Sequence, residues 1–352
     1  MRTVQSEYMH WAKTQSPARY NLASSEVPHF RLDRFPIDVA DLDLSGASHY
    51  RYPPLREAIA RKCGVPPDMV VMADGTSMAN MLAMAALIDP GDAVLIEHPA
   101  YEPMVATARF LGAEVKRFTR QGPVFALDPE EVARAAGGSR PKLIVLTNLH
   151  NPTGNLAGAD ALRALADIAE RVLIDEVYLD AAPGESTAAL LGDAFVTTSS
   201  LTKVYGLSGL RCGWILAEPG LAERMWRLNE LFGVAQAHAD ERLSCLALER
   251  LDEVAAETPA LLDRNRALAN AFFAGREDIE VAPMVQNVTA FPRLLGGDIE
   301  RLHDLLREHY DTAIVPGRFF GLADHFRIGV GGATDMVEEG LARLGAALDE
   351  IA

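Results

Sequence analysis

The chain has 352 residues, of which 49% are hydrophobic and 23% charged, and its formal net charge at pH 7 is −16. This length predicts two domains, because single hydrophobic cores stop growing at about 250–300 residues. The acidic balance argues against a nucleic-acid or anionic-membrane surface. Residues 1–14 lack the apolar core of a signal peptide, and the apolar segment 78–88 is about half as long as a membrane helix.

The three cysteines are Cys63, Cys212 and Cys245. Their odd number and their lack of metal-ligand spacing predict reduced thiols, no metal site and a cytoplasmic location. Cys212 is expected to pack as a small hydrophobic residue.

The N-terminal part, residues 1–44, predicts a helix followed by irregular chain, with residues 21–26 as an exposed loop. A turn over residues 49–54 leads into a helix over residues 55–62. From residue 69 onwards, short apolar runs alternate with helical patterns. Strands are predicted at 69–72, 93–97, 115–118, 142–147, 172–175 and 194–199, with helices at 77–88, 104–111, 128–136 and 158–170. This alternation predicts a mostly parallel sheet covered by helices on both faces, with ligands at the carboxyl ends of the strands.

A helix-rich segment over residues 221–274 is expected to leave the sheet. Beyond it, strands are predicted at 279–282, 288–291 and 326–330, and helices at 298–308 and 334–350. The sequence therefore predicts an α/β fold with a mostly parallel sheet sandwiched by helices, together with a smaller α+β domain. We expect the large cofactor-binding domain over residues 45–240, and the small domain over residues 1–44 and 241–352.

The stretch 199–214, SSLTKVYGLSGLRCGW, places Lys203 among hydroxyls and glycines, with Arg211 eight residues later. A lysine in a small, partly dehydrated pocket has its neutral amine favoured, which is the form that a Schiff base needs. Ser200, Thr202 and Arg211 are groups that can bind a phosphate. The alternative is a glycine-rich loop with an exposed lysine.

The pattern Ser-x-x-Lys followed by Gly-x-x-Gly-x-Arg-x-Gly resembles the pyridoxal-phosphate lysine segment of fold type I enzymes, specifically the class I/II aminotransferases. The resemblance implies that pyridoxal 5′-phosphate is the cofactor and that Lys203 forms the Schiff base with it. Further motifs that match the family follow in its order, from about Tyr50 to Arg327.

A phosphate cradle is predicted where the Asp-Gly-Thr-Ser sequence joins the first strand to its helix. Free amides and the positive end of the helix dipole face whatever lies beyond such a strand, although a simple helix cap would use the same residues. The resemblance implies that Gly75, Thr76 and Ser77 bind the cofactor phosphate opposite Ser200 and Arg211.

Two further positions follow strands of the predicted sheet. Tyr101 is either a core aromatic or, as the resemblance implies, the ring that stacks on the pyridine of the cofactor. Asn151 lies in an Asn-Pro-Thr-Gly turn, for which a structural loop is the alternative. In the resembled family this asparagine donates to the phenolic oxygen of the cofactor and reaches the substrate carboxylate. The neighbouring His150 is expected behind the site or on its rim.

Asp175 ends an apolar strand, where a buried carboxylate is costly unless it is paired. A protonated pyridine nitrogen would be such a partner, and it would keep the ring able to accept electrons. Tyr178 matches the family's tyrosine that donates to the phenolic oxygen.

Arg327 lies in an apolar strand and needs an anionic partner, for which a two-pronged carboxylate clamp is the most favourable use. The matching family arginine holds the α-carboxylate of the substrate, and a structural ion pair is the alternative. Arg318 is either a second anion contact that selects acidic substrates or an exposed or structural arginine. Residues 329–332, Gly-Val-Gly-Gly, lack the spacing of a dinucleotide loop.

The resemblance also implies a homodimer, in which a tyrosine before a Leu-Arg helix reaches the phosphate of the neighbouring subunit. Tyr50 and Tyr52 are the candidates for this contact, and packing within the turn is the alternative for both. The predicted function is transfer of an amino group between an α-amino acid and a 2-keto acid, with no nucleic-acid or membrane partner. Lyases, decarboxylases and ring-forming synthases on the same fold remain the alternative, because small changes in a pocket decide which bond breaks. A non-catalytic regulator is disfavoured, since this acidic chain lacks a basic DNA-binding segment.

Overall fold

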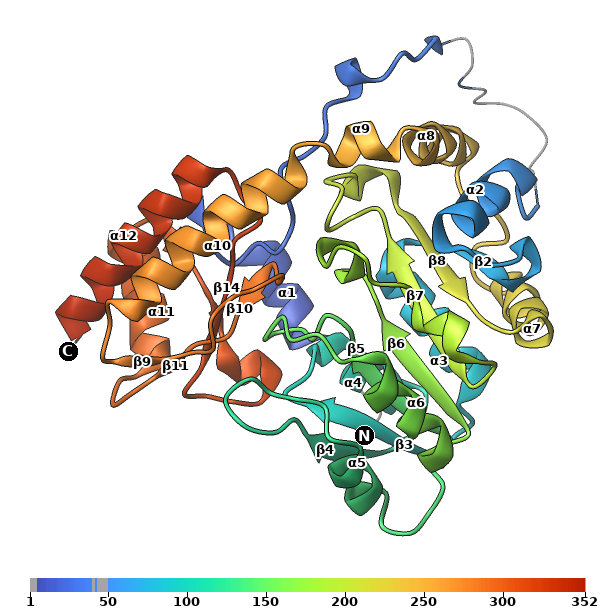
Figure 1. Cartoon of the computed structure of the whole chain (residues 1–352), viewed down its shortest axis with the longest axis horizontal. Helices are drawn as coiled ribbons and strands as arrows, with labels where there is room; N and C mark the ends of the chain where they lie inside the picture. The colour runs from blue at the N-terminus through green and yellow to red at the C-terminus, as the bar shows by residue number, and fades with distance from the viewer. Residues whose placement is uncertain (1–4, 40–41, 43–49, 352) are drawn as a thin grey trace.

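The computed structural model describes residues 5–39, 42 and 50–351 and contains one large sheet and a smaller group of strands and helices (Figure 1). The large sheet has seven strands in the order β2-β8-β7-β6-β5-β3-β4. The strands are β2 (Val70–Asp74), β3 (Ala93–His98), β4 (Glu114–Thr119), β5 (Leu143–Thr147), β6 (Arg171–Asp175), β7 (Phe195–Ser200) and β8 (Cys212–Leu216). This mostly parallel sheet with flanking helices confirms the predicted α/β class.

Strand β8 runs antiparallel to both of its neighbours, β2 and β7, and the sequence analysis did not predict it. All five of its residues are buried, but they directly follow the glycine-rich segment, which obscured the apolar run. Because Cys212 pairs with Asp74, the start of β8 and the preceding Arg211 lie at the carboxyl edge of the sheet, beside the end of β2.

In the described part of the chain, helices accompany the sheet and cover both of its faces. They are α2 (Pro53–Cys63), α3 (Gly75–Leu87), α4 (Glu102–Phe110), α5 (Pro129–Ala136), α6 (Ala159–Ile168), α7 (Pro219–Asn229), α8 (His238–Glu249) and α9 (Leu251–Ala255). Alternate residues of a strand point to opposite faces. Leu143 and Val145 accordingly pack into the core that contains α3, whereas Ile144 and Leu146 pack with α5 and α6.

The smaller part contains long helices beside short strands (Figure 1). Its helices are α1 (Glu7–Thr14), α10 (Thr258–Ala274), α11 (Ile299–His309) and α12 (Thr334–Ile351), and its strands are β1 (Tyr20–Asn21), β9 (Ile279–Glu280), β10 (Thr289–Ala290), β11 (Arg293–Leu294), β12 (Thr312–Ala313), β13 (Val315–Pro316) and β14 (Phe326–Gly329). Helix α10 joins the two parts, because Leu262 packs in the large core and Phe273 in the small one. The predicted domain limits stay a prediction, and residue 45 lies outside the described residues.

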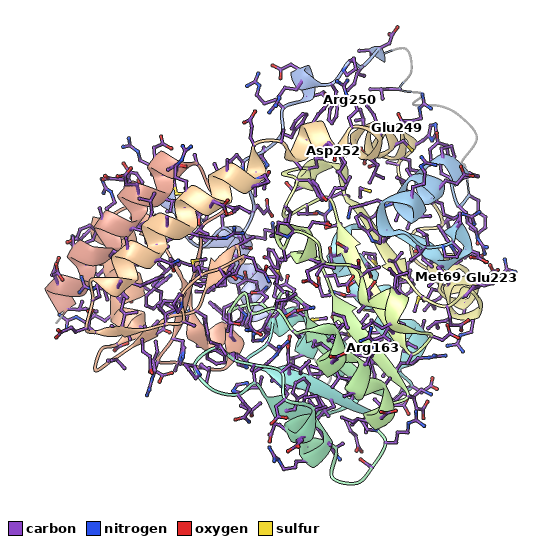
Figure 2. The ribbon with its side chains drawn as sticks, in the orientation of Figure 1. Met69, Arg163, Glu223, Glu249, Arg250 and Asp252 are labelled. Atoms are coloured by element: carbon purple, nitrogen blue, oxygen red, sulfur yellow. The ribbon has the colours of Figure 1, made fainter. Side chains whose placement is uncertain are left out.

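Single 3₁₀ turns complete the secondary structure at Leu32–Arg34, Pro67–Met69, Leu179–Ala181, Ala188–Leu191, Ser208–Leu210 and Gly317–Phe320. Side chains fill the space between the sheet and its helices, as Figure 2 shows. Within the described ranges, every helix is too short or too polar to cross a membrane.

Candidate active site

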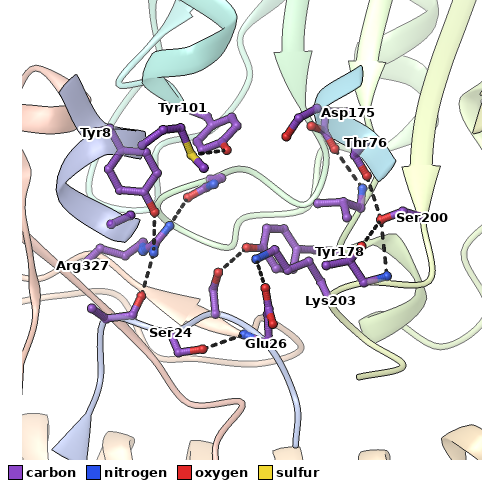
Figure 3. Close-up of a pocket in the computed structure, with 18 of the residues that line it drawn as sticks. Tyr8, Ser24, Glu26, Thr76, Tyr101, Asp175, Tyr178, Ser200, Lys203 and Arg327 are labelled. Atoms are coloured by element: carbon purple, nitrogen blue, oxygen red, sulfur yellow. Dashed lines mark hydrogen bonds and ion pairs between the residues drawn. The ribbon is translucent and has the colours of Figure 1, made fainter. Parts of the chain in front are cut away.

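A cavity of about 580 Å³ opens at the carboxyl edge of the large sheet, where α1 and the chain after it cover the strand ends (Figure 3). It brings together residues that are far apart in the sequence. The predicted site residues that line it are Thr76, Ser77, Tyr101, Asn151, Asp175, Tyr178, Ser200, Thr202, Lys203, Arg211 and Arg327. The carboxyl ends of parallel strands meet at one edge, which explains why motifs following separate strands converge here.

One end of the cavity is a cluster of hydroxyls around the first turn of α3. The helix begins at Gly75, two residues earlier than predicted, so the backbone amides of its first turn are free. Thr76 Oγ1 donates to Ser200 Oγ at 2.8 Å, and Ser200 Oγ donates to Thr202 Oγ1 at 2.9 Å. Arg211 donates to the carbonyl of Asp74 at 3.2 Å. Amides, hydroxyls and a guanidinium together form a site suited to a phosphate.

We expect Gly75→Ala to weaken binding of pyridoxal phosphate at least about tenfold, because the loss of one charge-assisted contact has this size. Gly75 has φ +76°, and a Cβ there would lie 2.3 Å from Nη2 of Arg211. The added methyl group would therefore displace the guanidinium. Titration of the cofactor onto protein from which it has been removed measures this effect.

The matched control is Gly64→Ala. Gly64 has a similar φ of +68°, but a Cβ there meets no atom within 4 Å. This variant has the same backbone strain without the collision and should bind the cofactor normally. Equal weakening in both variants would contradict the assigned role of Gly75.

Asp175 is the last residue of β6 and lines the cavity. Its Oδ2 accepts from Asn80 at 2.8 Å and its Oδ1 accepts from the amide of Val177 at 3.0 Å. Thr198 in turn donates to Asn80 at 2.6 Å, which fixes the amide group. Burial raises the pKa of Asp175 to about 6, although these hydrogen bonds and Lys203 oppose the shift. A cationic ring nitrogen would stabilise this carboxylate in its charged form.

The raised pKa makes a prediction for protein from which the cofactor has been removed. Between about pH 4 and pH 6 the folded protein binds a proton at Asp175 that the unfolded chain releases, so stability falls as the pH rises. A shift from 3.8 to about 6 corresponds to about 3 kcal/mol. Urea unfolding of the wild type and of Asp175→Asn should therefore give free energies whose difference changes by about 2–3 kcal/mol between about pH 4 and pH 7. A constant difference would show that the pKa is not raised.

Lys203 enters the cavity from the loop after β7, and its Nζ donates to Oε1 of Glu26 at 2.8 Å (Figure 3). Burial lowers the pKa of Lys203, but interactions with Tyr178 and Glu26 outweigh burial and raise the pKa above its ordinary value. The expectation of a neutral amine was therefore wrong for the protein without its cofactor. The sequence predicted a dehydrated pocket, but it contains no signal that the carboxylate of Glu26, 177 residues away, lies beside the lysine.

Arg327 lies at the opposite side of the cavity and is only 1% exposed. Its guanidinium donates to Oδ1 of Asn151 at 3.0 Å, to the hydroxyl of Tyr8 at 3.1 Å and to the carbonyl of Ala23 at 2.9 Å. All three acceptors are neutral, and Nε has no acceptor among the described residues. A buried guanidinium without an anion is costly, so the alternative of a structural ion pair does not apply and a ligand carboxylate fits here.

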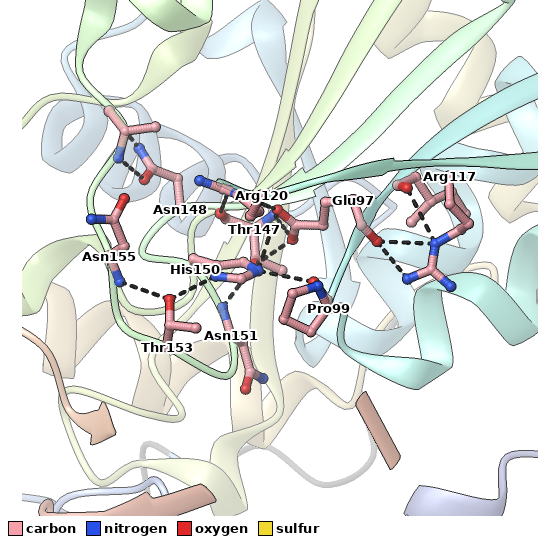
Figure 4. Close-up of polar contacts among 12 residues, drawn as sticks. Glu97, Pro99, Arg117, Arg120, Thr147, Asn148, His150, Asn151, Thr153 and Asn155 are labelled. Carbon is pink, nitrogen blue, oxygen red and sulfur yellow. Dashed lines mark hydrogen bonds and ion pairs between the residues drawn. The ribbon is translucent and has the colours of Figure 1, made fainter. Parts of the chain in front are cut away.

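A buried network of hydrogen bonds fixes the position of Asn151 (Figure 4). Its backbone amide donates to Oγ1 of Thr147 at 2.8 Å, and that hydroxyl donates to Glu97 at 2.8 Å. Glu97 also accepts two hydrogen bonds from Arg120, at 2.9 and 2.7 Å. His150 is fully buried beside this pair and contacts the carbonyl of Pro99 at 3.0 Å, so it lies behind the site and not on the rim.

Three predicted positions lie elsewhere. Tyr50 is 40% exposed, and its hydroxyl donates at 2.6 Å to Glu230, which directly follows α7. Tyr52 is buried with its ring edge-on to His238. A contact of either tyrosine with a second subunit stays a prediction. Arg318 pairs with Glu300 and is not among the residues that line the cavity, which supports the alternative of an exposed or structural arginine.

Three further residues at the cavity, Tyr8, Glu26 and Asn80, were not predicted from the sequence. Residues 21–26 were predicted as an exposed loop, but Leu22, Ala23 and Ser25 are buried and the segment forms a wall of the cavity. Tyr8 and Glu26 have no local signal, because their partners are 319 and 177 residues away. Asn80 does have one, since a polar residue one turn after Thr76 in an otherwise apolar helix faces the same side.

Comparison with known proteins identifies the group to which these features belong. The sequence model of the aminotransferase class I and II family matches residues 38–344. Capreomycidine synthase of Streptomyces vinaceus is 32% identical over 82% of this chain and 77% of its own length. The histidinol-phosphate aminotransferase of Halorubrum lacusprofundi is 30% identical over 84% of this chain and 79% of its own. The chain belongs to the class I and II aminotransferase family, whose cofactor is pyridoxal phosphate.

Solved structures agree on the fold. A PLP-dependent aminotransferase from Streptococcus suis superposes with a TM-score of 0.89 at 22% identity, covering 100% of this chain and 99% of its own. The PLP-dependent cyclase OrfR gives 0.87 at 25% identity, covering 99% and 98%. The α-aminoadipate aminotransferase LysN of Thermus thermophilus, complexed with N-(5′-phosphopyridoxyl)-L-leucine, gives 0.85 at 19% identity, covering 99% and 96%.

Proposed function

We propose that this chain is an aminotransferase that moves an amino group between an α-amino acid and a 2-keto acid. One observation carries the proposal: the amine of Lys203, the carboxylate of Asp175 and the guanidinium of Arg327 all line one cavity. These are an acid–base group, a partner for a cationic ring and a carboxylate clamp. Their joint presence fits an amino acid that reacts at its α-carbon.

The residues of the cavity suit pyridoxal phosphate at both ends. When bound, this cofactor supplies an aldehyde that reacts with amines and a ring that accepts electrons from a bond at the α-carbon. Thr76, Ser200 and Arg211 would hold its phosphate, and Asp175 would keep a proton on its ring nitrogen. The raised pKa of Asp175 and the close fit at Gly75 support this placement.

The chain's own groups then act on the substrate. Arg327 and Asn151 bind the α-carboxylate and hold the α-carbon within reach of Lys203. In its neutral form the amine of Lys203 would take the proton from that carbon, become an ammonium and donate the same proton to the cofactor, as a general acid–base group. Tyr178 donates to Ser25 at 2.6 Å, beside the cavity, and would exchange this contact for the phenolic oxygen of the cofactor.

Two further proposals concern the assembly and the location. We place the protein in the cytoplasm and expect a homodimer in which Tyr50 of one subunit approaches the phosphate site of the other. Sedimentation at equilibrium tests the dimer, and a monomeric mass at micromolar concentration would refute it.

A ring-forming synthase is the second candidate, because capreomycidine synthase and the cyclase OrfR are among the similar proteins. Turnover with and without a keto acid separates the two functions. An aminotransferase needs the keto acid for continued turnover and converts it into a new amino acid in equal amount. A synthase or lyase consumes the amino acid without a keto acid and releases a cyclic product or ammonia. Equal turnover with and without the keto acid would overturn the proposal.

A further inference from the structure

Glu26 occupies a fixed position between the two ends of the candidate substrate site. The carbonyl of Leu22 accepts from the amide of Gly329 at 2.7 Å, two residues after Arg327. The amide of Val27 donates to the carbonyl of Lys203 at 3.0 Å. The segment 22–27 is therefore tied to the strand of Arg327 at one end and to the loop of Lys203 at the other.

The carboxylate of Glu26 has a single partner. Its Oε1 accepts from Nζ of Lys203, and in the described part of the chain no other donor forms a hydrogen bond with this carboxylate. Both side chains are 26% exposed and line the cavity. Asp175, the other carboxylate in the cavity wall, differs because an amide side chain and a backbone amide hold it.

The proposed reaction removes this partner. Lys203 has to use its amine on the cofactor and the substrate, so it cannot also neutralise Glu26 throughout the reaction. Burial raises the pKa of Glu26, but Lys203, with Lys13 and His29 at longer range, outweighs burial and keeps the carboxylate charged. A charged carboxylate facing a partly dehydrated cavity is costly unless another cation pairs with it.

We propose that Glu26 binds the cationic side chain of a basic amino donor, while Arg327 binds the α-carboxylate of the same molecule. This inference rests on the proposed function. The negative charge of Glu26 and the positive charge of Arg327 match the two ends of such a substrate. Acidic donors are disfavoured, because their second carboxylate would lie beside Glu26.

Lys13 is the rival determinant, because it also lines the cavity and is positively charged. It lies in the last turn of α1 with an exposed side chain, so its charge is solvated and screened. Glu26, by contrast, is held by the backbone bonds of its segment. The more buried and more fixed charge should dominate selection.

The test compares L-lysine with L-norleucine, which has nearly the same shape but no terminal amine, using one keto acid acceptor and the complete enzyme. We expect kcat/KM for L-lysine to exceed that for L-norleucine at least about tenfold, as one ion pair in a partly buried site allows. Glu26→Gln should lower this ratio at least about tenfold. Lys13→Met should preserve the ratio.

A binding measurement gives a readout that does not depend on turnover. 2-Methyl-L-ornithine and 2-methyl-L-norleucine lack an α-hydrogen, and quenching of tryptophan fluorescence reports their binding because Trp11 lines the cavity. The basic ligand should bind more tightly to the wild type, and Glu26→Gln should remove that difference.

Three results would overturn the inference: equal binding of the two ligands, equal losses for both substrates in Glu26→Gln, or a preference for L-glutamate that Lys13→Met abolishes. The second result would mean that Glu26 only positions Lys203. If no amino acid and keto acid pair is converted, the proposed function fails instead, and the binding measurement still decides the role of Glu26.

Discussion

Lys203→Ala should lower steady-state turnover by a factor of about 10⁴ or more and remove the cofactor absorbance that depends on the lysine. Lys203 and Lys13 are the two lysines among the described residues that line the cavity. Lys13 is exposed in α1 and lies in a different element, so it cannot take over the role. Turnover with added keto acid and the absorption spectrum of the purified variant measure both effects.

The matched control for this prediction is Lys142→Ala. Lys142 pairs with Glu170 at 2.9 Å on the surface and does not line the cavity. An exposed pair of this kind contributes about 0–1 kcal/mol to stability, so the control should keep its activity. Full activity in Lys203→Ala would refute the assigned role of the lysine and the proposed function with it.

Arg327→Leu should lower kcat/KM for every amino donor by a factor of about 10² or more. Removing one partner of a buried charge pair costs about 2–5 kcal/mol. The loss should appear mainly as a higher KM, because the arginine binds the carboxylate in the ground state as well as during the reaction. Arg327→Lys should recover little of it, since an ammonium cannot form the two parallel contacts of a guanidinium.

Arg266→Leu controls for the loss of a buried arginine as such. Arg266 is 7% exposed and donates to the carbonyls of Gln286 and Asn287, outside the cavity lining. This variant should lose stability in thermal unfolding while its folded fraction keeps the KM of the wild type. An unchanged KM in Arg327→Leu would show that the carboxylate binds elsewhere.

The cofactor half of the site could be predicted from the sequence because each part of it is local. The cradle at Gly75, the turn at Asn151, Asp175 and the Lys203 segment each lie at the end of a strand or within a few residues after it. Parallel strands bring their carboxyl ends to one edge, so the order of short motifs along the chain was enough to place them together. The alternation of short apolar runs with helical patterns likewise predicted the α/β class.

Apart from Arg327 and Asn151, the residues around the candidate substrate site could not be predicted without the tertiary structure. The N-terminal segment looked like an exposed loop, yet it brings Tyr8 to Arg327 and Glu26 to Lys203. Contacts over such distances in the chain leave no periodic pattern in the sequence, and the two-residue strands that align them are too short to show one. The charge expected for Lys203 differs from the charge that the structure favours for the same reason, because the pKa of a group depends on its neighbours in space.

The sequence by itself therefore predicted the family and the cofactor, which the comparisons confirm, and Lys203 as the lysine that reacts with the cofactor, which stays a prediction. The tertiary structure decided that β8 runs antiparallel and sets Arg211 beside Gly75, that Arg318 pairs with Glu300, and that Glu26 faces the cavity. The physical reason is that cofactor chemistry requires particular residue types next to strand ends, whereas the shape and charge of a substrate pocket come from segments that meet only after folding.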